Sequence, residues 1–70
     1  MRAKIVARLR YAKDVVTSES FECASMLAAS QFHGDFWNAH FASNDRFSTT
    51  MSVFNEETQR WRVAEVINWG

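Results

Sequence analysis

Two segments of the chain carry arginine at alternate positions, and these side chains are well suited to binding an anion. Near the start of the chain the residues are Arg8 and Arg10. Near its end, Arg60 and Arg62 flank Trp61. Each guanidinium presents several N–H donors in one plane, which match the oxygens of a carboxylate or a phosphate. Several of them on one surface would attract an acidic protein or a nucleic acid.

The other reactive residues do not form a catalytic or metal-binding pattern. Cys23 is the single cysteine, and the histidines His33 and His40 lack the close Cys/His spacings of a tetrahedral zinc site. The sequence contains no glycine-rich phosphate loop and no paired acids with an evident cleft. A small sheet with one helix also offers little concavity for a substrate. We therefore expect no enzyme activity, no metal and no cofactor.

The totals indicate a single ordered domain over residues 1–70. A chain of this length buries only about 60% of the surface that it exposes when unfolded, so its core must be rich in large side chains. Aromatic residues make up 14% of the sequence, and there are two glycines and no proline. No segment approaches the roughly 20 apolar residues that span a bilayer. With one cysteine and no basic-apolar leader, we expect a soluble cytoplasmic protein, in the host cytoplasm if a phage encodes it.

The first half of the chain predicts a strand followed by a helix. Residues 2–11 alternate, with Ala3 and Ile5 on the apolar parity and basic residues on the other, as in a half-buried strand. Residues 15–17 form either a short returning strand or a lead into the next element. Serine and glutamate at positions 18–20 are a helix start signal, and an apolar stripe from Phe21 to Phe32 has helical spacing. Gly34 is a natural stop.

The second half predicts three antiparallel strands. Apolar residues alternate over residues 37–41, 47–53 and 60–69, and turn-forming residues lie between these segments, at 44–45 and at 55–58. Glu65 interrupts the apolar parity of the last strand. This interruption predicts either a bulge or an edge position at which the Glu65 carboxylate is exposed to solvent.

The predicted fold is α+β, with one helix packed on one face of a small, mostly antiparallel sheet. The sheet has four strands, or five if residues 15–17 also pair, in the chain order strand-helix-strand-strand-strand. Its other face is uncovered and collects the basic residues together with a ladder of serine and threonine. The predicted partner-binding residues are Lys4, Arg8, Arg10, His40, Phe54, Arg60, Trp61, Arg62 and Trp69. The alternatives without a binding function are that the basic residues form an ordinary solvated face and that Trp61 belongs to the core.

The run Thr17-Ser18-Glu19-Ser20-Phe21-Glu22-Cys23-Ala24, between an alternating strand and a tryptophan-bearing hairpin, resembles small phage and mobile-element proteins. The arrangement is similar to the phage inhibitor of bacterial RNA polymerase and to anti-CRISPR proteins, which lay a helix on a small antiparallel sheet. The resemblance is one of pattern and transfers no binding residue. It implies a protein that blocks a host machine by occupying one of its surfaces.

These observations predict a small non-enzymatic inhibitor that binds a host protein or nucleoprotein complex through a basic sheet face. Direct binding of nucleic acid is an alternative, although a formal net charge of zero is a poor electrostatic match for it. Another alternative is a self-associating structural protein, a homodimer in which edge strands pair across a two-fold axis and bury aromatic side chains.

Overall fold

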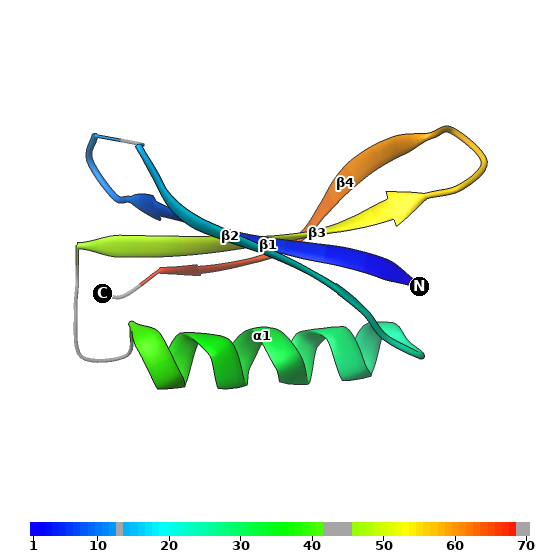
Figure 1. Cartoon of the computed structure of the whole chain (residues 1–70), viewed down its shortest axis with the longest axis horizontal. Coiled ribbons are helices and arrows are strands. Elements are labelled where there is room, and N and C mark those ends of the chain that lie inside the picture. Colours follow the sequence, from blue (N-terminus) through cyan, green and yellow to red (C-terminus); the bar gives the residue numbers. More distant parts are fainter. Residues whose placement is uncertain (13, 42–45, 69–70) are drawn as a thin grey trace.

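Four strands and one helix make up the computed structural model, which describes residues 1–12, 14–41 and 46–68 (Figure 1). The elements in chain order are β1 (Arg2–Leu9), β2 (Val15–Glu22), α1 (Met26–His40), β3 (Phe47–Asn55) and β4 (Arg60–Asn68). All neighbouring strands are antiparallel, and their order in the sheet is β2-β1-β3-β4. The predicted fold class, one helix on a four-stranded antiparallel sheet, is confirmed.

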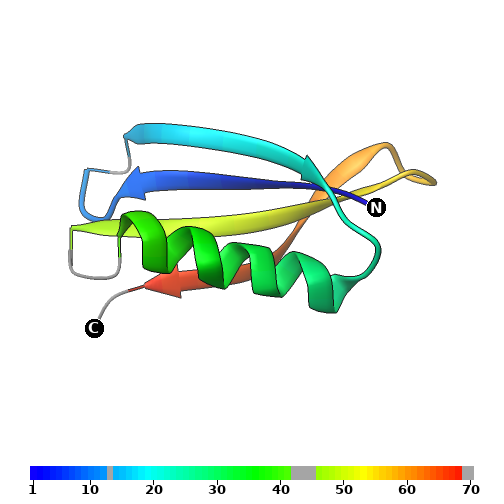
Figure 2. The same ribbon diagram turned by 60° about the horizontal axis from the view of Figure 1, so that its bottom comes forward.

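The helix lies against one face of the sheet, which we term the covered face (Figure 2). No other described element lies on the opposite face, which we term the open face (Figure 1). The covered face of β1 is formed by Ala3, Ile5 and Ala7, which are fully buried. This confirms the predicted parity of the first strand. Ile5 packs against Met51 of β3 and Ala29 of α1 to form the centre of the core.

The helix does not begin where the sequence predicted it, because residues 15–22 form strand β2. The β-branched residues at positions 15–17 favour a strand, and Phe21 faces the covered side opposite Ala3. The helix begins instead after Ser25, whose hydroxyl accepts a hydrogen bond from the backbone N–H of Ala28 at 3.2 Å. The chain order is therefore strand-strand-helix-strand-strand, and the order predicted from the sequence is wrong.

The strand predicted over residues 37–41 is also wrong, because α1 continues through Gly34 to His40. The buried stripe of α1 consists of Ala29, His33 and Trp37, each four residues from the next. Trp37 and Phe41 fit alternation and also lie one helical turn apart, so the two periods cannot be distinguished in a segment this short. The apolar stripe predicted over residues 21–32 is also wrong. Phe21 belongs to β2, and Leu27 of the helix is 70% exposed.

Gly34 lies inside a helix where a side chain would be tolerated. A Cβ added there would meet nothing within 4 Å. Glycine in a helix interior costs roughly 0.5–1 kcal/mol relative to alanine, because its unfolded backbone has more freedom to lose. We expect Gly34→Ala to raise the free energy of unfolding by about 0.5–1 kcal/mol in urea titrations with an unchanged m-value. A destabilised variant would show that the helix needs glycine at this position.

The predicted interruption at Glu65 is a β-bulge. Glu65 lies opposite Met51, and Val63 lies opposite Ser52, so Ala64 is the extra residue. The bulge reverses the parity of β4. Before it, odd-numbered residues lie on the open face, and after it they lie on the covered face.

The connection predicted at residues 55–58 is confirmed as the β3–β4 turn. The Asn55 side-chain oxygen accepts hydrogen bonds from the backbone N–H groups of Glu57 and Thr58, at 2.9 and 3.2 Å. Gln59 then adopts a left-handed conformation with φ of 59°. The length of this turn fixes Trp61 opposite Phe54.

Candidate functional site

The centre of the open face is a row of cations bordered by hydroxyl groups. Lys4 lies on β1 between Ser20 of β2 and Ser52 of β3. Two positions further along β1, Arg8 lies opposite Ser48. Both cationic residues are half-buried, and the Lys4 ammonium lies over the ring of Trp61.

Two aromatic rings on the same face are covered by cations. The Arg2 guanidinium carbon lies 4.5 Å from the centroid of the Phe54 ring, and Lys4 Nζ lies 4.3 Å from that of Trp61. The two rings meet edge to face with centroids 5.3 Å apart. Such contacts attract because the face of an aromatic ring is electron-rich. Arg2, Lys4, Phe54 and Trp61 therefore form one unit, which we term the cation–aromatic cluster.

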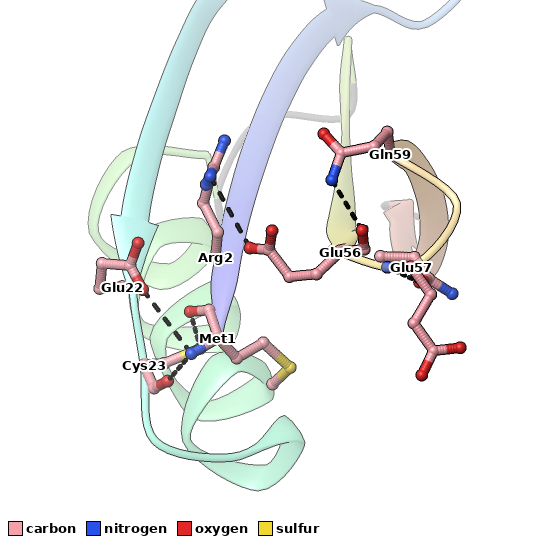
Figure 3. Close-up of polar contacts among 8 residues, drawn as sticks. Met1, Arg2, Glu22, Cys23, Glu56, Glu57 and Gln59 are labelled. Carbon is pink, nitrogen blue, oxygen red and sulfur yellow. Dashed lines mark hydrogen bonds and ion pairs between the residues drawn. The ribbon is translucent and has the colours of Figure 1, made fainter.

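Among the described residues, carboxylates form ion pairs at one end of this cluster. Arg2 forms an ion pair with Glu56 at 3.7 Å, and the Met1 amino group forms one with Glu22 at 3.6 Å (Figure 3). That amino group also donates a hydrogen bond to the backbone carbonyl of Cys23 at 2.8 Å, which ties the start of β1 to the end of β2. Within the described residues, Lys4 and Arg8 form no ion pair. No carboxylate of the described residues therefore neutralises these two charges.

The structure does not bring Arg60 and Arg62 to the open face. They lie opposite Asn55 and Val53, on the covered side of the β3–β4 hairpin. Arg62 there lines a hollow beside Met26 at the start of α1. The prediction that all the arginines share one surface is wrong, because the register set by the 55–59 turn places Trp61, and not its neighbours, on the open face.

Three further predicted residues lie elsewhere or outside the described residues. His40 belongs to the last turn of α1, with its ring 4.8 Å from that of Phe36, and so is not on the sheet. Arg10 follows β1, and its guanidinium carbon lies 5.6 Å from the ring centroid of Tyr11. Trp69 lies outside the described residues. Of the predicted set, Lys4, Arg8, Phe54 and Trp61 share the open face.

Sequence reasoning missed a buried polar cluster on the covered face. His33 is fully buried; its Nδ1 donates to Glu65 Oε1 at 2.6 Å, and its Nε2 lies 2.7 Å from Thr49 Oγ1. Ser30 Oγ donates to Glu65 Oε2 at 2.7 Å. The signals were present: a serine and a histidine three apart on one helix face, and a glutamate that breaks the apolar parity of its strand.

In this cluster the Thr49 hydroxyl contacts the His33 imidazole, which contacts the Glu65 carboxylate. These are the chemical groups of a nucleophilic triad. Thr49 and His33 are both fully buried, so a substrate could not reach the hydroxyl in this conformation. Every buried side-chain nitrogen and oxygen among the described residues has a hydrogen-bond partner. The cluster thus joins α1 to β3 and β4 through satisfied polar contacts, and its geometry supports a structural role.

No family model matches the chain, and no curated protein or solved structure is significantly similar to it. In the described part of the chain, no helix has the length and hydrophobicity of a membrane span.

Proposed function

We propose that this protein is a non-enzymatic interaction module that binds an acidic partner protein through the open face of its sheet. The observation that carries the proposal is the pair of cations Lys4 and Arg8, which are half-buried, lack ion pairs with described residues and lie on a face that no described element covers. Cations held in this way can form charge-assisted hydrogen bonds with carboxylates and lose little side-chain entropy.

The apolar residues beside these cations favour a protein as the partner. Val63 and Val66 of β4 share the open face and are 60% and 50% exposed, and Trp61 is 37% exposed. Arginine and tryptophan next to aliphatic side chains are typical of protein interfaces. Nucleic acid is a poorer match, since the formal net charge is zero and Lys4 already covers one face of Trp61.

Such a module would act as an inhibitor if the acidic surface that it covers normally receives another ligand. This is the mechanism implied by the resemblance to small phage inhibitors and anti-CRISPR proteins. It needs no catalytic group, because occupation of the surface and electrostatic competition suffice. A host protein or nucleoprotein complex with an acidic docking site is the partner class that we propose.

A pair of charge-matched double variants tests the surface. We expect Lys4→Ala/Arg8→Ala to reduce partner binding at least roughly tenfold, since charge-assisted hydrogen bonds contribute about 1.5–3 kcal/mol each. Arg60→Ala/Arg62→Ala removes the same charge from the covered side and should bind nearly as well as wild type. The measurement is quantitative affinity capture from host lysate at two salt concentrations, with circular dichroism to confirm folding.

Equal capture by Lys4→Ala/Arg8→Ala and wild type would refute the proposal. The nucleic-acid alternative is tested by fluorescence anisotropy with a labelled single-stranded oligonucleotide at low salt. Binding there that falls linearly in log salt, and that is lost in the Lys4/Arg8 variant, would reassign the same face to a phosphate backbone.

A further inference from the structure

Strand β4 has an outer edge that is unpaired among the described strands and that carries both valines and charged residues. It is the last strand in the sheet order, so among the described strands only β3 pairs with it. Its exposed residues include the aliphatic Val63 and Val66, and it carries charges of both signs, Arg62 and Glu65. Unpaired N–H and C=O groups along such an edge can pair with another strand.

We propose that two copies of this chain pair antiparallel through β4, with Arg62 opposite Glu65 of the partner subunit and Trp61 opposite Val66 of the partner subunit. The two-fold axis would run perpendicular to the sheet and pass between Val63 and Ala64. Opposite charges and aromatic–aliphatic pairs are the cross-strand pairs that stabilise antiparallel sheets. Each pair occurs twice across the axis.

The bulge at Ala64 makes this register possible. Because it reverses parity, Trp61 and Val66 both lie on the open face, and Arg62 and Glu65 both lie on the covered face. Without the extra residue, positions 61 and 66 would lie on opposite faces and could not oppose one another in a flat ladder. The bulges of both copies would meet at the axis, so neither interrupts the ladder elsewhere.

The charged side chains of β4 are available for these contacts. Arg62 is exposed and forms no ion pair with a described residue. The Glu65 side chain is 34% exposed although it accepts from His33 and Ser30. A carboxylate has about four acceptor positions, so it can receive an additional guanidinium.

The other edge strand, β2, lacks this complementarity. Its charged residues are Glu19 and Glu22, and it contains no cation. Two β2 strands would therefore bring like charges together, which is unfavourable. Pairing of β2 with β4 of another copy would place glutamates of β2 near arginines of β4. This contact is heterologous, however, so it leaves a β2 and a β4 edge unpaired and produces polymers.

Pairing through β4 would join the two sheets into one of eight strands with both open faces on the same side. The rows that contain Lys4 and Arg8 would then flank a central apolar strip from both copies. This inference does not depend on what the open face binds.

Sedimentation equilibrium over a range of concentrations tests the association. We expect a monomer–dimer equilibrium for wild type, and for Arg62→Glu a dissociation constant at least about tenfold higher, since two attractive pairs become repulsive. Arg60→Glu makes the same charge change opposite Ile67 of the partner subunit and should have a smaller effect. A monomer at millimolar concentration, or a ladder of growing polymers, would overturn the proposal.

Cysteine pairs test the register in a Cys23→Ser background. Opposed residues of an antiparallel pair have Cα atoms about 4.5–5.5 Å apart, within disulfide range. Within one chain, positions 61 and 66 are about 16 Å apart and cannot cross-link. We expect Trp61→Cys/Val66→Cys to form a covalent dimer on oxidation and Trp61→Cys/Asn68→Cys to remain largely monomeric. The reverse result would overturn the register.

Discussion

Replacement of Glu65 by alanine is expected to lower the free energy of unfolding by about 2–4 kcal/mol, because it leaves two groups without their acceptor. His33 is fully buried, and the substitution removes the carboxylate that accepts a hydrogen bond from its Nδ1. Ser30 loses the acceptor of its hydroxyl at the same time. The measurement is urea unfolding at equilibrium, followed by circular dichroism.

Two control variants distinguish the stability lost from the polar cluster from the stability lost by removing any carboxylate. Glu56→Ala removes an exposed carboxylate that pairs with Arg2 on the surface, and should cost at most about 1 kcal/mol. Glu65→Gln keeps an acceptor for His33 and should lose less than alanine. All variants should carry Arg62→Glu, so that association through β4 does not contribute. Equal stability of the Glu65→Ala and Glu56→Ala proteins would contradict a structural role for the cluster.

A second large loss of stability is expected for Ile5→Ala, about 2–5 kcal/mol, from lost burial and the cavity left behind. Ile5 is fully buried on the central strand β1, where it packs against Ala29 and Met51. A domain of this size has a total stability of only about 4–10 kcal/mol. The variant should therefore unfold at much lower urea concentration, and it could be largely unfolded at 37 °C.

The neighbouring position provides the matched control. Val6 lies on the open face between Ser18 and Thr50 and is only half-buried, so Val6→Ala should cost roughly 1 kcal/mol or less. The comparison tests the division of the sheet into a covered and an open face. Similar losses at positions 5 and 6 would mean that another layer covers the open face in solution, as close association with a partner would produce.

The sequence predicted those parts of the fold that depend on local pattern. Alternation in β1 and β3 identified the buried parity, and the 55–58 turn was recognised because it is encoded within a few residues. At Glu65 the broken parity predicted a bulge or an edge position, and the structure has a bulge at the preceding residue, Ala64. The helix was misplaced because Ser18 and Ser25 can both cap a helix. Only pairing with β1, a tertiary contact, decides that the first of them lies in a strand.

The candidate site was predicted in part for the same reason. Lys4 and Arg8 belong to one regular strand, so their common face follows from parity alone. Arg60 and Arg62 were misassigned because their face depends on the register that a turn imposes. The cluster around His33 was missed because its four residues come from a helix and two strands, and local spacing relates only Ser30 and His33.

The central ladder between β1 and β3 has a consequence for how the protein is made. It joins residues 3–9 to residues 47–53, with β2 and α1 between them in the chain. A nascent chain on the ribosome can form the β1–β2 hairpin early. Until β3 emerges, however, Ile5 lacks its contact with Met51, and the cluster of Ala7, Trp37 and Phe41 lacks Phe47. Translation that pauses before residue 47 should therefore leave a chaperone-dependent, protease-sensitive intermediate.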